Sequence, residues 1–162
     1  MMYTSVYMKP LLARLTLLTV LLIAFVFFIF SRSDEPEIEP FISYTNASED
    51  LIMVTSPALN EKISSPLAIS GKARGPWYFE ATAPVLLVDW DGRIIAESYI
   101  TAQDNPSTEL ETGWMTEDFV PFTGTLEFPV PSLYPRGALI FRNSNPSGLP
   151  ENDRAVDIPI RF

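Results

Sequence analysis

The chain has 162 residues, enough for one ordinary domain and an additional segment, and its 15 prolines against 7 glycines favour many short elements over long helices. It contains no histidine and no cysteine, which excludes the commonest general base, a thiolate nucleophile, the common zinc sites and any disulfide. The net charge of −9 at pH 7 argues against nucleic acid as a partner.

A long apolar segment lies near the N-terminus. Residues 11–30, from Leu11 to Phe30, would form a helix rising about 1.5 Å per residue, enough to span the roughly 30 Å hydrocarbon core of a bilayer. The sequence therefore predicts a transmembrane anchor. A cleaved signal peptide is the alternative, because residues 31–33 include small side chains. However, the apolar run is longer than a signal peptide usually has, and it ends in bulky residues.

The charges that flank this segment predict its orientation. Lys9 and Arg14 lie at its N-terminal end, whereas Arg32 is followed at once by Asp34 and Glu35. Basic residues favour the cytoplasmic side. We therefore expect a single-pass protein of the cytoplasmic membrane, with residues 1–10 inside and the C-terminal domain outside.

Residues 31–50 are rich in acidic residues and contain two prolines but few aliphatic residues. Such a segment cannot build a core, so the sequence predicts a stiffened, solvated linker. Residues 33–162 hold all 20 acidic residues but only 8 of the 11 basic ones, a net charge of −12. This acidity fits a domain held away from an anionic membrane surface.

From Leu51 onward, apolar residues recur at every second position, as in half-buried strands. The Asp91-Gly92 dipeptide is typical of a tight hairpin turn. The pattern predicts seven strands, at residues 51–55, 67–73, 85–89, 94–100, 120–128, 138–143 and 156–162. With turn signals between them and no amphipathic helix, residues 51–162 are expected to form an all-β, immunoglobulin-like antiparallel β-sandwich of two packed sheets.

Three consecutive aromatic residues follow a Gly-Pro turn signal in "GPWYFEA", residues 75–81. In an extended chain, Trp77 and Phe79 share one face while Tyr78 and Glu80 share the other. Trp77 and Phe79 are the more apolar pair, so we expect them to face the core. Tyr78 and Glu80 would then lie on a polar outer edge, where they are candidate binding residues.

The loop "NSNPSGLPENDR", residues 143–154, joins two predicted strands. Its amides and hydroxyls can form turns that bond their own backbone. Alternatively, it is a recognition loop, because loops on a rigid sandwich often carry binding. Under this second interpretation its candidate binding residues are Asn145, Ser147, Glu151 and Asp153.

Carboxylates are the remaining source of metal or catalytic chemistry. The acids that could gather around calcium or act as a glycosidase pair are Asp89, Asp91, Glu151, Asp153 and Asp157. Each also has a structural explanation, in a hairpin turn, in a loop or on the outward side of a strand. We therefore predict no catalytic residue, metal or cofactor, and a carboxylate-based hydrolase is a remote alternative.

Four blocks in residues 51–162 carry a resemblance to a known family. They are "SPALNEKISSPLAISGKARGPWYFEA", "VLLVDWDGRIIAE", "WMTEDFVPFTGTLEF" and "NPSGLPENDRAVDIPIRF". In this order and spacing they resemble the immunoglobulin-like domain family associated with bacterial spore germination. One departure is Ser144, which stands where the family usually has an Asp before its Asn-Pro-Ser-Gly turn.

The resemblance implies a bacterial, envelope-facing, non-catalytic module, often attached to another domain with a germination or sporulation connection. We therefore expect an interaction module for an envelope protein or a cell-wall polymer. The alternative is a structural spacer or scaffold subunit with no ligand of its own. An exposed apolar or aromatic patch would favour the interaction module, and a uniformly acidic surface would favour the spacer or scaffold.

Overall fold

The computed structural model describes residues 14, 17–26, 39–103, 113–129 and 135–162. The chain has two compact units, Met1–Glu39 and Pro40–Phe162. In the first, residues 14 and 17–26 are helical. No helix among the described residues has both the length and the apolar character needed to cross a membrane. The predicted cytoplasmic segment 1–10, the anchor residues 11–13, 15–16 and 27–30, and linker residues 31–38 lie outside the described residues.

The second unit is all-β, as predicted. It contains β1 (Ser43–Thr45), β2 (Ile52–Ser56), β3 (Leu67–Arg74), β4 (Thr82–Asp89), β5 (Ile94–Ala102), β6 (Phe119–Leu126), β7 (Arg136–Arg142) and β8 (Ala155–Arg161). The strands β2 to β8 correspond to the seven predicted strands, with shifted ends. Their hydrogen-bonded order is β1-β8-β7-β4-β5-β6-β3-β2, and every ladder between them is antiparallel.

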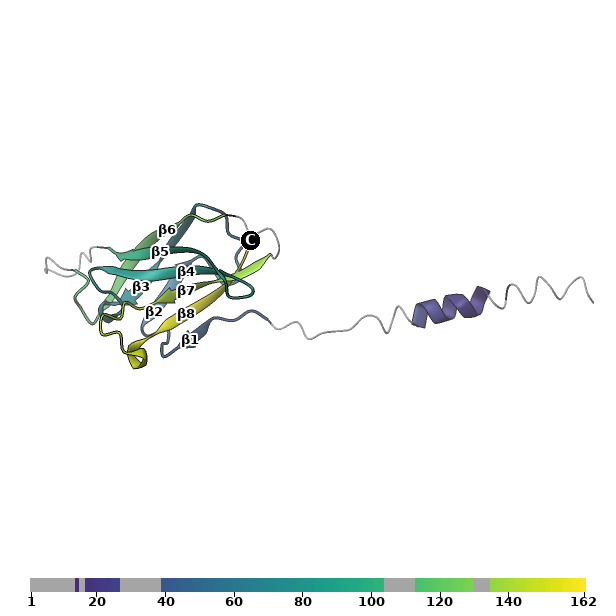
Figure 1. Ribbon diagram of the computed structural model, residues 1–162, viewed down its shortest axis with the longest axis horizontal. Coiled ribbons are helices and arrows are strands. Elements are labelled where there is room, and N and C mark those ends of the chain that lie inside the picture. Colours follow the sequence, from purple (N-terminus) through teal and green to yellow (C-terminus); the bar gives the residue numbers. More distant parts are fainter. Residues whose placement is uncertain (1–13, 15–16, 27–38, 104–112, 130–134) are drawn as a thin grey trace, which may run out of the picture. The chain divides into compact units, whose positions relative to one another are not determined.

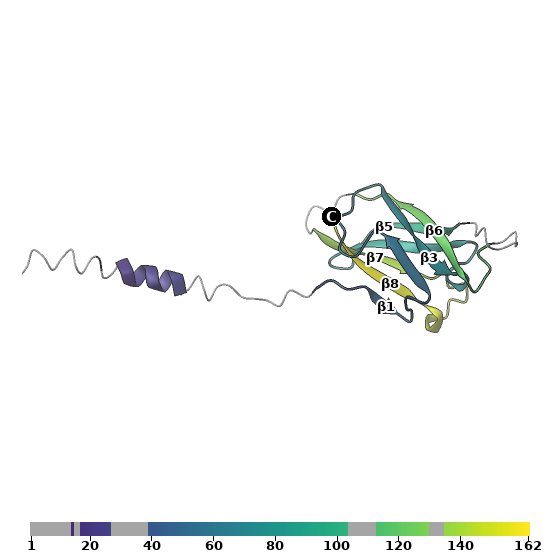
Figure 2. The same cartoon turned by 180° about the vertical axis from the view of Figure 1, so that it is seen from behind.

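The sheet folds over on itself to make two layers. Figure 1 shows the layer that contains β4, β5, β7 and β8, and Figure 2 shows β3 and β6 from the opposite side. The last residues of β5 pair with β4 on one edge and with β6 on the other, the β6 pairs being Ile100–Gly124, Thr101–Thr123 and Ala102–Phe122. The predicted two sheets are therefore the layers of one continuous sheet, because β5 hydrogen-bonds to both.

The core lies between the layers and consists of the inward residues of each strand. Phe122 of β6 and Phe141 of β7 meet there, with ring centroids 6.2 Å apart, although their strands are not neighbours in the sheet. Other fully buried side chains come from both layers: Ile52, Ile69, Val85, Leu87, Leu139 and Ile158. In a chain without cysteine, this apolar packing is what stabilises the domain.

The N-terminal boundary of the domain is earlier than predicted. Residues 43–45, which the sequence assigns to the linker, form β1 and pair with Ala155–Asp157 of β8. Ile42 and Tyr44 also pack against the core. The other half of β8 is flanked by residues 60–63, where the Ile63 amide donates to the Arg161 carbonyl at 2.8 Å. The linker prediction is therefore corrected at its end: the compact unit begins at Pro40. The sequence did not reveal this strand because the segment has few aliphatic residues. Its strand conformation depends on pairing with β8.

Candidate functional site

One layer of the sandwich carries apolar side chains on both of its faces. In β4, Ala83, Val85 and Leu87 are buried in the core, so the residues between them point away from it. Residues that lie opposite each other on paired strands point to the same face, so the partners of these residues on β5, β7 and β8 also point away from the core. We use "outer face" for the apolar residues that point away from the core in this layer: Pro84, Leu86, Val88, Ile94, Tyr99, Ala138, Ile140 and Pro159.

These residues are continuous from β4 through β7 to β8, whereas on β5 the exposed Glu97, which pairs with Leu86, separates Tyr99 from Ile94. Leu86 pairs with Ile140, and Val88 pairs with Ala138, which in turn pairs with Pro159. Val88 is only 7% exposed although it does not belong to the core cluster, so neighbouring side chains cover it on the outer face. Two members are more than half exposed: Tyr99 (63%) and Ile94 (51%). An outward sheet face is usually polar, so these apolar residues are unusual at such a position.

The outward side of the opposite layer has a different composition. Along β3 and β6 it carries mainly polar residues, among them Ser70, Lys72, Arg74, Thr123 and Thr125. The cationic groups of Lys72 and Arg74 lie 4.9 and 4.6 Å from the centroid of the Phe119 ring. This difference shows that the apolar outward surface is a property of one layer rather than of the whole domain.

Asp157 is an acidic residue that points outward beside the outer face. It pairs with Ile140 of β7 on one side and with Ser43 of β1 on the other, where the Ser43 hydroxyl lies 3.4 Å from its carboxylate. Burial raises the pKa of Asp157 above its ordinary value, and the hydrogen bond from Ser43 opposes that shift. The apolar surroundings thus disfavour the carboxylate form.

A groove of about 550 Å³ lies between the end of the outer face and the loop 143–154. Its aromatic wall is formed by Tyr99 and by Phe79, which is 46% exposed. Its polar wall contains Arg142 and Asp153, whose closest nitrogen and oxygen atoms are 3.9 Å apart. Rings and charged groups therefore meet at one place, where they can contact both apolar and polar parts of a partner.

The first two aromatic residues of "GPWYFEA" are both buried. Residues Gly75–Trp77 form a 3-10 turn, so Trp77 and Tyr78 do not follow strand alternation. Trp77 is 3% exposed, as predicted, but Tyr78 is 4% exposed, and its predicted outward position is wrong. The Tyr78 hydroxyl donates to the Val120 carbonyl at 3.0 Å. Burial raises the pKa of Tyr78 well above its ordinary value, and a backbone hydrogen bond opposes the shift.

Phe79 and Glu80 have a different arrangement from the predicted one. Phe79 and Thr82 exchange backbone hydrogen bonds around a tight turn in which Glu80 and Ala81 have positive φ angles of 51° and 61°. This turn directs Phe79 outward, so its predicted position in the core is also wrong. Glu80 is exposed, as predicted, at the tip of the turn.

The polar residues of the loop 143–154 bond mainly to one another. The Asn145 amide donates to the Leu149 carbonyl at 2.8 Å and to the Asp153 carboxylate at 2.9 Å. The Ser147 hydroxyl donates to the Asn145 side-chain oxygen at 2.5 Å. Glu151 lies exposed on the 3-10 turn Pro150–Asn152. These contacts support the turn-forming interpretation of the loop, and their effect is to fix one wall of the groove.

Of the remaining acidic candidates, Asp91 is exposed in the hairpin turn and Asp89 has a local structural role. Asp89 accepts hydrogen bonds from the backbone amides of Asp91 and Arg93, at 3.1 and 2.9 Å, and forms an ion pair with Arg93 at 3.3 Å. It therefore shapes the β4–β5 hairpin. In the described ranges, no group of three or more acidic residues is placed to hold a metal ion.

Sequence reasoning missed the outer face and the groove. A signal was present in "VLLV", residues 85–88, since an uninterrupted apolar run indicates a strand covered on both faces. The pairing that joins this run to Ile140 and Pro159 depends on the fold.

Comparison with known families identifies one that covers more than half of the chain. Residues 51–148 match the immunoglobulin-like domain of bacterial spore germination. The curated proteins and the solved structures gave no match. The matched region runs from the start of β2 through the Asn-Pro-Ser-Gly turn, and the eight-stranded antiparallel fold agrees with it. The chain therefore belongs to the family of immunoglobulin-like domains of bacterial spore germination.

Proposed function

We propose that this protein is a non-catalytic interaction module of a bacterial envelope, held at the outer side of the cytoplasmic membrane by residues 11–30. The length and apolar character of this segment, together with the basic residues before it, support the anchor and its orientation. Family membership supports a non-catalytic module.

The outer face is the observation that carries the binding role. An isolated domain gains nothing in water from exposed apolar residues such as Tyr99 and Ile94, whereas a partner that covers them removes apolar area from water. A spacer would need no such surface. The outer face therefore favours an interaction module, and an envelope protein is the partner that suits a sheet face on which apolar and charged residues lie side by side.

A cell-wall polymer is the second candidate partner, and the groove is the observation that favours it. Phe79 and Tyr99 expose rings on which a sugar could stack, while Arg142 and Asp153 can hydrogen-bond to hydroxyl or amide groups. The groove adjoins the outer face through Tyr99 and Pro84, so a protein and a polymer would compete for the same surface.

Chemical crosslinking in cells tests this proposal, and the cysteine-free chain allows a clean design. Tyr99→Cys places a thiol on the outer face, and Thr123→Cys places one on the exposed side of the opposite layer as the matched control. Cells that retain their wall are treated with a membrane-impermeant maleimide that carries a photoreactive group. We expect both variants to be labelled, and only Tyr99→Cys to form a specific adduct on irradiation.

The two parts of the proposal can fail separately. Labelling that requires lysis of the cells would contradict the location. If both positions are labelled but give the same adducts, or if neither gives one, the outer face is not the binding surface. Adducts with a protein or with wall fragments would distinguish the two candidate partners.

A further inference from the structure

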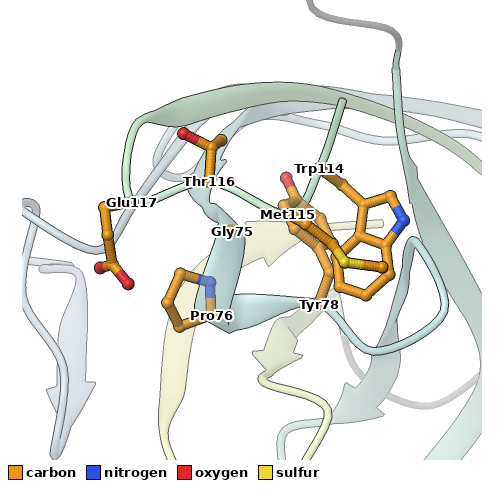
Figure 3. A pocket seen from close by; sticks show the side chains of 7 residues that line it. All are labelled: Gly75, Pro76, Tyr78, Trp114, Met115, Thr116 and Glu117. Carbon is orange, nitrogen blue, oxygen red and sulfur yellow. The ribbon is translucent and has the colours of Figure 1, made fainter. Parts of the chain in front are cut away.

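A second pocket lies away from the outer face, where the 3-10 turn after β3 meets the segment before β6. It has a volume of about 310 Å³ and is lined by Gly75, Pro76, Tyr78, Trp114, Met115, Thr116 and Glu117. Figure 3 shows Tyr78, Trp114 and Met115 together on one side and Pro76 and Glu117 on the other. We call it the Trp114 pocket. It shares no residue with the outer face or the groove, and its size suits a single side chain or small group.

The walls of the Trp114 pocket are fixed by close contacts. A Cβ atom on Gly75 would lie 1.9 Å from the Thr116 carbonyl oxygen and 2.4 Å from that of Trp114, so only glycine lets the two segments lie this close. The Asp118 amide donates to the Thr116 hydroxyl at 3.1 Å. Tyr78 is held by its hydrogen bond to Val120. These contacts hold the backbone around the pocket and the Tyr78 ring in place, which lowers the conformational entropy lost when a ligand binds.

The chemistry of the pocket favours a cation. Tyr78 and Trp114 supply aromatic rings and Met115 a thioether, which together suit an aliphatic stem or a positive charge. The Glu117 carboxylate makes no hydrogen bond or ion pair in the described part of the chain. Acidic Asp118 follows it directly, and none of the lining residues is basic.

A basic residue, Arg74, lies beside the pocket without lining it. Arg74 donates from Nε to the Asp50 carbonyl at 2.6 Å and from Nη1 to the Glu117 carbonyl at 2.8 Å. Its guanidinium also lies over the ring of Phe119. Arg74 therefore braces the backbone beside the pocket, and among the described residues it forms no ion pair with the Glu117 carboxylate.

We infer that the Trp114 pocket binds the cationic side chain of a partner peptide, with the aliphatic stem against the rings and the charge near Glu117. Lysine and arginine share this chemistry. The inference goes beyond the proposed function and does not depend on the outer face.

Short peptides test the inference on the full chain in detergent. The probes are acetyl-Gly-Lys-Gly-amide, its arginine analogue and its norleucine analogue, which keeps the stem but lacks the charge. The readout is the indole N–H NMR signal of Trp114, assigned by its loss in Trp114→Phe. We expect the cationic peptides to shift this signal saturably, the norleucine peptide to shift it at least tenfold more weakly, and Trp90 to be unaffected.

Variants of the acidic residue complete the test. Glu117→Gln should weaken the binding of the cationic peptides about three- to tenfold, whereas Glu127→Gln, an exposed control on another segment, should not change it. Of the lysine and arginine peptides, the one that binds with the higher affinity identifies the preferred head group. Equal binding of the norleucine peptide, equal shifts at Trp90, or no saturable shift would each overturn the inference. None of these results would affect the crosslinking expected from the Tyr99→Cys variant. The peptide-binding inference can therefore fail while the proposed function stands.

Discussion

Alanine substitution along Trp77, Tyr78 and Phe79 is expected to give two large losses of stability followed by a small one. Trp77 and Tyr78 are 3% and 4% exposed, so each replacement removes a large aromatic side chain from the core and should cost about 3–5 kcal/mol. Phe79 is 46% exposed. Since burying a whole Phe side chain is worth about 1.5–3 kcal/mol, Phe79→Ala should cost only about 1 kcal/mol.

The free energy of unfolding, measured by urea denaturation with tryptophan fluorescence and far-UV circular dichroism, checks this order. Because a loss of 3–5 kcal/mol approaches the whole stability of many domains, Tyr78→Phe provides a milder variant. It keeps the ring and removes only the hydroxyl that donates to Val120, at a cost of about 0.5–1.5 kcal/mol. If Phe79→Ala proved more destabilising than Tyr78→Ala, strand alternation would hold here and the 3-10 turn would be wrong.

Two further outcomes follow from strands β8 and β1. Burial raises the pKa of Asp157 above its ordinary value of 3.8. The folded state therefore holds this proton more tightly than the unfolded state, so the stabilisation is fully present below pH 3.8 and is lost as the pH rises through the raised pKa. Asp157→Asn should therefore raise the melting temperature slightly at pH 7 and leave it unchanged below about pH 3.8, and a lower melting temperature at pH 7 would refute this reasoning. Removing residues 1–50 should lower the melting temperature relative to removal of residues 1–39, because only the longer deletion takes away β1 and the packing of Ile42 and Tyr44. Equal melting temperatures would show that β1 adds no stability.

The strands were the most predictable part of the fold. In β6 and β8, residues such as Val120, Phe122, Val156 and Ile158 alternate with polar ones, and this period comes directly from the pleat of a half-buried strand. Strand β1 was missed because three residues are too few to show a period. Its strand state depends on β8, more than 100 residues away in the sequence, which local patterns do not contain.

The candidate sites were harder to predict because they depend on pairing and on turns. Alternation gave the wrong direction for Tyr78 and Phe79, since a 3-10 turn and two residues with positive φ replace a regular strand there. The outer face needs the register that brings Leu86 beside Ile140. The Trp114 pocket needs Gly75 to approach a segment about 40 residues later. The polar loop 143–154 was a visible signal, and its side chains turned out to bond within the loop.

The two edges of the sheet bear on how copies of this protein behave when they are crowded together. An exposed strand edge can recruit the backbone of another chain and start aggregation. Here one edge is β1, with three residues, and the other is β2, with five residues, a register shift between Val54 and Ser56, and Pro57 directly after it. Neither edge offers a long regular ladder for a neighbour. The domain thus carries an apolar sheet face while giving neighbouring copies little opportunity for edge-to-edge pairing.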